Sequence, residues 1–268
     1  WLVTPYWMTN DDVGMSMRAH GYGAFEVGSA NLFFSNVLWG HFVRVLPEIG
    51  GILGYSLATH LVLAATAGFS CYYLMRFGLR PLLAAGAVFI TFFLPFIAPQ
   101  FTVNAGLSAL TAMLALAAYA RDRHLADLLL FIGFSFLAFI IRSHEFLLIC
   151  LVAVPLLMSK FLLKDKRFCL AVVVLGSALM TAHYVDQRAY QAPEWQRFND
   201  LQSIRVQLTD YGLAEKLRGT PESMAAGLSE NDLDLVSEWF FADADLISAV
   251  QSVEMQLSGT EAKQAWKL

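Results

Sequence analysis

Two adjacent carboxylates, Asp11 and Asp12, are the residues of this sequence that point most directly to chemistry. They stand just ahead of an amphipathic stretch, in a chain that otherwise consists largely of apolar segments. A carboxylate can accept the proton of an attacking hydroxyl and can stabilise positive charge that develops at a reacting carbon. A solvated turn or a helix cap would use the same residues without any chemistry. Adjacent carboxylates point in different directions in most backbones, so the pair does not imply a shared proton.

A group of ionisable residues, Arg142, His144 and Glu145, follows one of the apolar segments. A reaction that releases a lipid phosphate needs a cation, and the planar guanidinium of arginine makes bidentate, charge-assisted hydrogen bonds to phosphate. Ionisable groups near membrane depth are costly and tend to be functional, so Arg142 and His144 are candidates for phosphate binding. In the alternative interpretation Arg142 reaches the headgroups by snorkelling, and Glu145 only pairs with it.

Three polar residues are candidate substrate contacts: Gln100, Glu145 and Arg205. Gln100 could hydrogen-bond a sugar or cap a helix, and Arg205 could contact an acceptor or form a surface ion pair. Asp11 and Asp12 offer the oxygen ligands that hard divalent cations prefer, but two carboxylates are too few to define a metal site. We therefore expect no cofactor, with a divalent metal left open.

The elements that would position these groups are apolar. Apolar residues make up 57% of the chain and charged residues 15%, well below the roughly 25% charged of soluble domains. Six segments approach the length of about 17 to 20 residues that spans a bilayer. They cover about 52–75, 82–98, 104–120, 125–141, 147–163 and 168–185. The sequence therefore predicts an all-α membrane helix bundle of about six spans, in which His60 is a satisfied bundle histidine rather than a ligand.

The distribution of charge predicts the orientation of these spans. Up to Val185 the chain carries 11 basic and 8 acidic side chains, and from Asp186 onward 7 basic and 14 acidic ones. Basic residues concentrate in alternate loops, as is typical of cytoplasmic loops. They are Arg76, Arg80, Arg121, Arg123, Lys160, Lys164, Lys166 and Arg167. The other loops, and everything after Asp186, are expected outside a plasma or inner membrane, and the charge pattern offers no footprint for nucleic acid.

Three regions follow from this pattern. Residues 1–50 form a first outer loop with the acidic pair and an interfacial helix, residues 51–185 hold the six spans, and residues 186–268 form an acidic, helical extracytoplasmic region.

Short patterns predict helices in the two outer regions. From Asn31 onward, apolar residues recur at helical spacing in a stretch too polar to span, which favours a helix in the membrane interface. Trp7 and Trp39 would anchor it there. Further on, Thr220-Pro221 and Ser229-Glu230-Asn231-Asp232 are typical of helix starts.

The order of these elements resembles a known family. The stretch YWMTNDDVGMSMRAHGYG followed by NLFFSNVLWG resembles the first outer loop of bacterial polytopic type C glycosyltransferases, the GT-C fold. PQFTVNAG and FIIRSHEFLL are similar to further segments of that group, and YGLAEKLRGT with GLSENDLDLVSEWFFAD resembles its outer insertion. The chain opens at Trp1 rather than methionine, and its first apolar residues resemble the end of a preceding helix, so we expect a fragment.

The resemblance implies an enzyme that transfers a sugar from a polyprenyl-phosphate donor to a cell-envelope glycan or lipid acceptor at the outer face of the membrane. Asp12, or else Asp11, matches the family's catalytic base. Three other functions stay open: a lipid or glycan transporter or flippase, a polysaccharide polymerase or ligase of similar topology, and an inactive assembly protein. A transporter would favour ionisable or helix-breaking residues near the midplane of the membrane.

Overall fold

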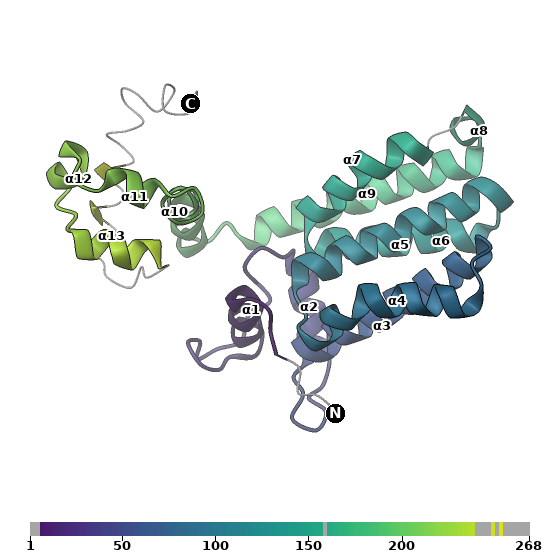
Figure 1. The fold of residues 1–268 in the computed structure, drawn as a ribbon, viewed down its shortest axis with the longest axis horizontal. Coiled ribbons are helices and arrows are strands. Elements are labelled where there is room, and N and C mark those ends of the chain that lie inside the picture. Colours follow the sequence, from purple (N-terminus) through teal and green to yellow (C-terminus); the bar gives the residue numbers. More distant parts are fainter. Residues whose placement is uncertain (1–5, 158–159, 239–247, 250–251, 254–268) are drawn as a thin grey trace. The chain divides into compact units, whose positions relative to one another are not determined.

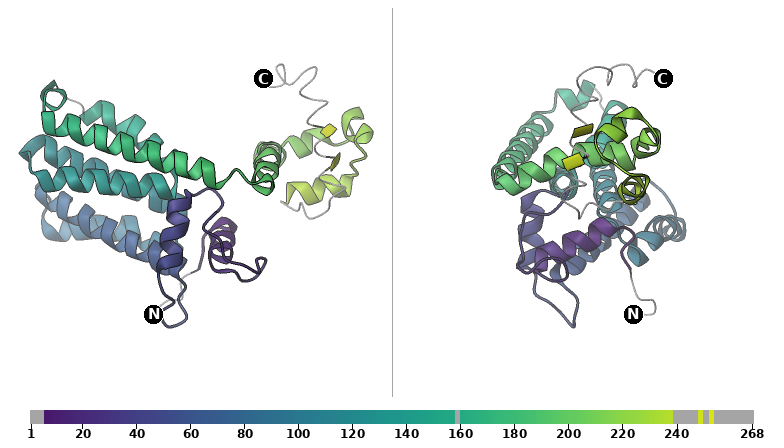
Figure 2. Two further views of the ribbon diagram at one scale, coloured as in Figure 1. Left: turned by 180° about the vertical axis from the view of Figure 1, so that it is seen from behind. Right: turned by 90° about the vertical axis from the view of Figure 1, so that its left-hand side faces the viewer.

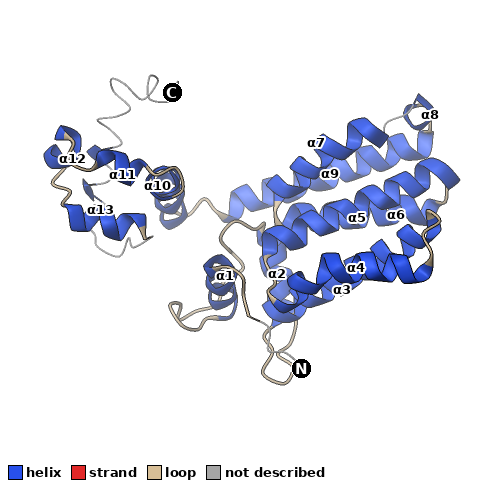
Figure 3. Cartoon of the chain, in the orientation of Figure 1, coloured by secondary structure: helices blue, strands red, loops and turns tan. Residues whose placement is uncertain are grey.

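The computed structural model describes residues 6–157, 160–238, 248–249 and 252–253. Within these ranges the regular secondary structure is helical, as expected, and an isolated bridge joins Ile49 and Ile52 (Figure 3). The chain divides into two compact units, Trp1–Ala189 and Tyr190–Leu268.

The first unit is a bundle of roughly aligned helices with two short helices at one end (Figures 1 and 2). The short helices are α1 and α2, and the bundle is formed by α3 to α7 and α9, with the single turn α8 before α9. Their bounds are α1 Asn10–His20, α2 Val37–Val45, α3 Gly54–Arg76, α4 Pro81–Ile97, α5 Phe101–Asp122, α6 Leu125–Ile141, α7 Ser143–Leu157, α8 Lys160–Leu163 and α9 Lys166–Ala189.

Three helices of the described chain are long and apolar enough to cross a membrane: α3, α5 and α9, with 23, 22 and 24 residues. At about 1.5 Å per residue each exceeds the roughly 30 Å of a hydrocarbon core. The apolar helices α4, α6 and α7 have 17, 17 and 15 residues. The chain is therefore a helical protein with the long apolar helices of a membrane protein.

The contact between α3 and α5 uses small and hydroxyl-bearing residues. Ser70 and Thr111 join through their hydroxyls at 2.8 Å, and Thr66 and Ser108 at 3.3 Å. Buried alanines stand beside Ser108 and Thr111 along α5: Ala105, Ala109, Ala112 and Ala115. Small side chains allow close backbone approach, and hydrogen bonds between helices replace the hydrophobic driving force that lipid does not supply. This interface fixes the two helices whose first residues form the candidate site.

The first outer segment differs from the expectation in two respects. Residues 10–20, expected as loop, form α1, and the interfacial helix expected from Asn31 begins only at Val37. Trp39 is 1% exposed and packs inside the unit, so it is not a membrane anchor. Gly40 permits this packing, because a Cβ there would lie 1.8 Å from the carbonyl oxygen of Ala30. Only a residue without a side chain allows α2 to approach the Ala30 backbone this closely.

The second unit is a small helical cluster. Its helices are α10 Pro193–Thr209, α11 Leu213–Leu217, α12 Pro221–Ala225 and α13 Glu230–Ser237. Both predicted helix starts are confirmed: α12 begins at Pro221, and Ser229 and Asp232 form a capping box at α13. Buried leucines and Val236 form its core, among them Leu208, Leu217, Leu228 and Leu233. The last part of the GLSENDLDLVSEWFFAD stretch, from residue 239, lies outside the described residues.

Candidate functional site

The candidate site lies where α1, α3 and α5 begin. Helix α1 places Asp12 in its first turn, and Gly21 ends the helix in a left-handed conformation with φ of 72°. The chain then returns along α1, where the N–H of Ser29 donates to the carbonyl of Arg18 at 2.8 Å. His20 accepts a hydrogen bond at Nε2 from the N–H of Tyr55, at 3.0 Å, and so joins α1 to the start of α3.

Asp12 is fully buried and its carboxylate joins three elements. Its Oδ1 accepts hydrogen bonds from the Tyr55 hydroxyl at 2.9 Å and from the backbone N–H of Phe101 at 3.1 Å. Its Oδ2 accepts from the Thr9 hydroxyl at 2.9 Å. The N–H of Phe101 is one of the otherwise unpaired donors at the start of α5, where negative charge is favoured.

The environment of Asp12 changes its acidity. Burial is the dominant cause and raises the pKa of this carboxyl to about 6. The hydrogen bonds from Thr9, Tyr55 and Phe101 act in the opposite direction, and the neighbouring charge of Asp11 adds a small increase. A carboxyl with a pKa near 6 is a stronger base than an ordinary aspartate. Asp11, by contrast, is exposed, so the two adjacent carboxylates occupy different environments.

Arg142 contacts the side chain of Phe101, whose backbone N–H bonds Asp12. Its guanidinium carbon is 4.8 Å from the centre of the Phe101 ring and 5.5 Å from that of Phe34. Its Nε is 2.9 Å from Oε2 of Glu145, so the expected pairing of these two residues is present. Contact with aromatic faces and one carboxylate holds the guanidinium plane in a fixed orientation.

Phe34 adopts a left-handed backbone conformation, with φ of 63°. This conformation is costly for a residue with a bulky side chain. Its neighbours hold it in place: the Ser35 hydroxyl donates to the Ile141 carbonyl at 2.8 Å, and the Asn36 side chain donates to the Ala182 carbonyl at 3.1 Å. The strained turn presents the Phe34 ring to Phe101 and Arg142.

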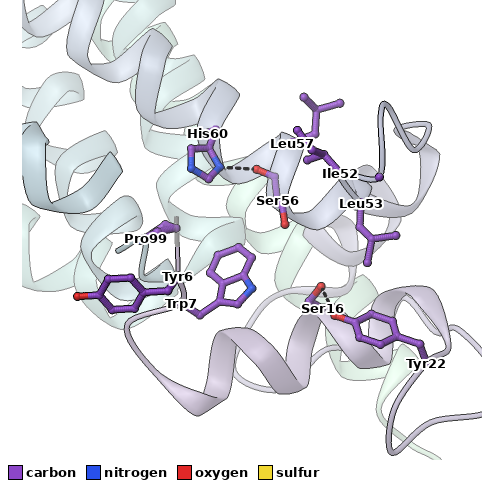
Figure 4. A pocket seen from close by; sticks show the side chains of 11 residues that line it. Tyr6, Trp7, Ser16, Tyr22, Ile52, Leu53, Ser56, Leu57, His60 and Pro99 are labelled. Carbon is purple, nitrogen blue, oxygen red and sulfur yellow. Dashed lines mark hydrogen bonds between the residues drawn. The ribbon is translucent and has the colours of Figure 1, made fainter. Parts of the chain in front are cut away.

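A cavity of about 390 Å³ opens between α1 and the start of α3 (Figure 4). Aromatic side chains line it together with hydroxyls and one imidazole: Tyr6, Trp7, Ser16, Tyr22, Ser56 and His60. Trp7 packs edge-on against Tyr55, the partner of Asp12, with ring centres 5.3 Å apart. Ser16 follows Asp12 by one helical turn. Asp12 itself does not line the cavity.

His60 is held within the bundle, as expected, and also lines the cavity. Its Nδ1 is 2.8 Å from the carbonyl of Ser56, one turn earlier in α3, and its Nε2 is 3.3 Å from the carbonyl of Phe96. Since an imidazole nitrogen must carry a proton to bond a carbonyl, the shorter contact indicates donation from Nδ1.

The structure brings most of the predicted site residues to one end of the bundle. Gln100 precedes α5 and is half-buried, and its side chain makes no capping hydrogen bond, so the capping interpretation does not hold. His144 is exposed.

Arg205 belongs to the second unit, where it bonds Gln202 and lies over the ring of Phe198. Among the described residues, no three His, Cys, Asp or Glu side chains gather in a way that could hold a metal ion.

Sequence reasoning missed Tyr55, His20 and Phe34 as parts of this site. Tyr55 and His20 stand in the sequence as an ordinary helix residue and loop residue, and only their hydrogen bonds across the fold identify them. The sequence matches no protein-family model, no curated protein and no solved structure.

Proposed function

We propose that this protein is an integral membrane glycosyltransferase of the GT-C type. It would take a sugar from a polyprenyl-phosphate donor and place it on a cell-envelope glycan or lipid. The observation that carries the proposal is the arrangement around Phe101, where a buried carboxylate and a cation contact the same residue at the start of α5.

The proposed reaction assigns one task to each group. Asp12 accepts the proton of the acceptor hydroxyl, whose oxygen forms a bond to the anomeric carbon of the sugar. The bond from that carbon to the lipid phosphate breaks, and the phosphate keeps the electron pair. Arg142 neutralises the departing phosphate. Because Asp12 is enclosed by Thr9, Tyr55 and Phe101, an acceptor reaches it only after one of these contacts opens.

The proposal includes a topology of six spans, formed by α3 to α7 and α9. The basic residues at the far ends of α3 and α5 support a cytoplasmic location for that end. Asp12, Arg142 and the second unit would then be extracytoplasmic. The cavity beside Trp7 would receive a sugar ring, because aromatic faces with nearby hydroxyls suit such a ligand.

The test is transfer of label from polyprenyl-phosphate sugars by membranes that contain the protein, compared with Asp12→Asn and Asp11→Asn. The amide has nearly the same shape as the carboxylate, and it can bond Tyr55 and Phe101 through its oxygen and Thr9 through its nitrogen. We expect transfer to be lost in Asp12→Asn and retained in Asp11→Asn. Equal transfer by all three proteins would remove Asp12 as the base, and no transfer by any correctly inserted form would favour a transporter.

A further inference from the structure

A groove of about 420 Å³ runs between α3 and α6. It lies along the half of α3 that leads to Arg76, away from the end that holds Asp12. Small residues shape it, with Ala64 and Gly68 on α3 and Ala126 on α6, and Phe69, Tyr72 and Leu130 add apolar surface. Asp127, in the first turn of α6, is the one carboxylate among the lining residues.

Asp127 is 2% exposed, and its two oxygens differ in their contacts. Oδ1 accepts hydrogen bonds from Arg76 Nη1 at 2.6 Å and from the Tyr73 hydroxyl at 3.1 Å. Oδ2 is buried and has no hydrogen-bond partner within the described part of the chain. An unpaired oxygen of a buried carboxylate is costly, and it is a ready acceptor for a donor that enters the groove.

The arginines near Asp127 leave one of its oxygens without a hydrogen bond. Arg76 serves two carboxylates, because its Nε and Nη2 bond Asp122 Oδ2 at 3.1 and 2.8 Å. Only its Nη1 bonds Asp127, and it does so at Oδ1. Arg121 lies 3.4 Å from Asp122, and its partner is Asp122 rather than Asp127. Oδ2 of Asp127 is therefore a carboxylate acceptor that receives no hydrogen bond within the described residues, and charge-assisted hydrogen bonds favour a cationic donor for it.

We infer that this groove binds a membrane lipid with a primary ammonium headgroup, of the phosphatidylethanolamine class. The ammonium donates to Asp127 Oδ2, and an acyl chain follows α3 past Gly68 towards Ala64, about 12 Å deeper at 1.5 Å per residue from Tyr72. A primary ammonium supplies three N–H donors on a compact charge, whereas a trimethylammonium supplies none. This site is independent of the function proposed for Asp12.

Native mass spectrometry of the purified protein tests this inference by titration with phosphatidylethanolamine and with phosphatidylcholine of identical acyl chains. We expect about tenfold tighter binding of phosphatidylethanolamine, which is the scale of one charge-assisted hydrogen bond. The preference should disappear in Asp127→Asn. Equal affinities for the two lipids in the wild-type protein would overturn the assignment.

Asp127→Asn also weakens the ion pair with Arg76, so a second variant leaves that pair intact. A Cβ at Gly68 would have no atom within 4 Å, and Gly68→Leu therefore fills the groove without displacing the backbone. Gly86→Leu on α4 is the matched control, since its Cβ would be equally free. We expect about tenfold weaker phosphatidylethanolamine binding in Gly68→Leu only. Unchanged binding in Gly68→Leu, or an equal loss in both variants, would overturn the assignment to this groove.

Discussion

The carboxylate of Asp12 accepts a hydrogen bond from the backbone N–H of Phe101, which lies 89 residues further along the chain. This bond joins the first turn of α1 to the first turn of α5, and the Tyr55 hydroxyl extends the connection to α3. A single side chain thus determines the relative position of three helix starts.

Tyr55→Phe should destabilise the protein by about 1–3 kcal/mol, because it removes one of the hydrogen-bond donors to a buried carboxylate, and water does not replace that donor. The midpoint of thermal unfolding in detergent measures the effect. Tyr72→Phe is the control, since Tyr72 is 47% exposed and the same hydroxyl is lost from a surface position. Equal midpoints for the two variants would show that the bond from Tyr55 to Asp12 does not stabilise the fold.

The pH dependence of stability should carry the signature of Asp12. Its pKa is raised to about 6 in the folded protein, so the neutral form is favoured by folding. Its contribution to stability is then fully present below the unfolded pKa of about 3.9 and is lost as pH rises through 6. His20 acts in the opposite direction, because burial lowers its pKa and its stabilising contribution is lost as pH falls.

The difference between wild type and Asp12→Asn isolates the carboxyl, since His20 is common to both. We expect the stability of wild type relative to Asp12→Asn to fall by up to about 1.4 kcal/mol per pH unit between about pH 4 and pH 6, and to be constant above that. Thermal midpoints between about pH 4 and pH 8 measure this difference. A difference that is constant with pH would place the ionisation of Asp12 outside this range.

Arg142→Lys should weaken use of a polyprenyl-phosphate donor although the charge is retained. Lysine has no planar fork to lie over Phe101 or to bind a phosphate in two places, so the donor KM should rise about tenfold. Arg123→Lys is the control, because Arg123 also lies over an aromatic ring, that of Tyr119, and pairs with a carboxylate, that of Asp165, but at the opposite end of the bundle. An unchanged KM in Arg142→Lys would contradict phosphate binding by Arg142 and favour the alternative, in which its side chain reaches the lipid headgroups.

Gly40→Ala should destabilise the fold by more than about 2 kcal/mol, although alanine is the better helix former. The added Cβ would lie 1.8 Å from the Ala30 carbonyl oxygen, which is backbone and cannot rotate away. Gly86→Ala, where a Cβ meets nothing within 4 Å, should instead stabilise by up to about 1 kcal/mol. Thermal midpoints of both variants test the contrast, and similar shifts would contradict the role of Gly40.

The sequence allows prediction of what depends on local patterns. The length of the apolar segments predicted the helices of the bundle, and the capping box at Ser229 was recognisable from four consecutive residues. The order of the predicted spans placed Asp12, Gln100 and Arg142 at the same end of the helix bundle, because alternate loops lie on the same side of a membrane. The burial of Asp12 was not predictable, because it depends on Tyr55 and Phe101, which are distant in sequence. Asp127 escaped notice because it stands inside an apolar run, and only Arg76 and Tyr73 reveal its role.

The attachment of residues 31–37 to α9 has a consequence for biogenesis. Asn31 and Asn36 donate to the carbonyls of Ala189 and Ala182, and the N–H of Val37 donates to Asp186. These partners lie about 150 residues later in the chain, and chains emerge from the ribosome N-terminus first. The turn at Phe34 therefore locks only after α9 has been synthesised. The end of the bundle that holds Asp12 is therefore completed only after α9 has been made, and a chain released before α9 would carry Asp12 and Arg142 without the contacts that hold residues 31–37.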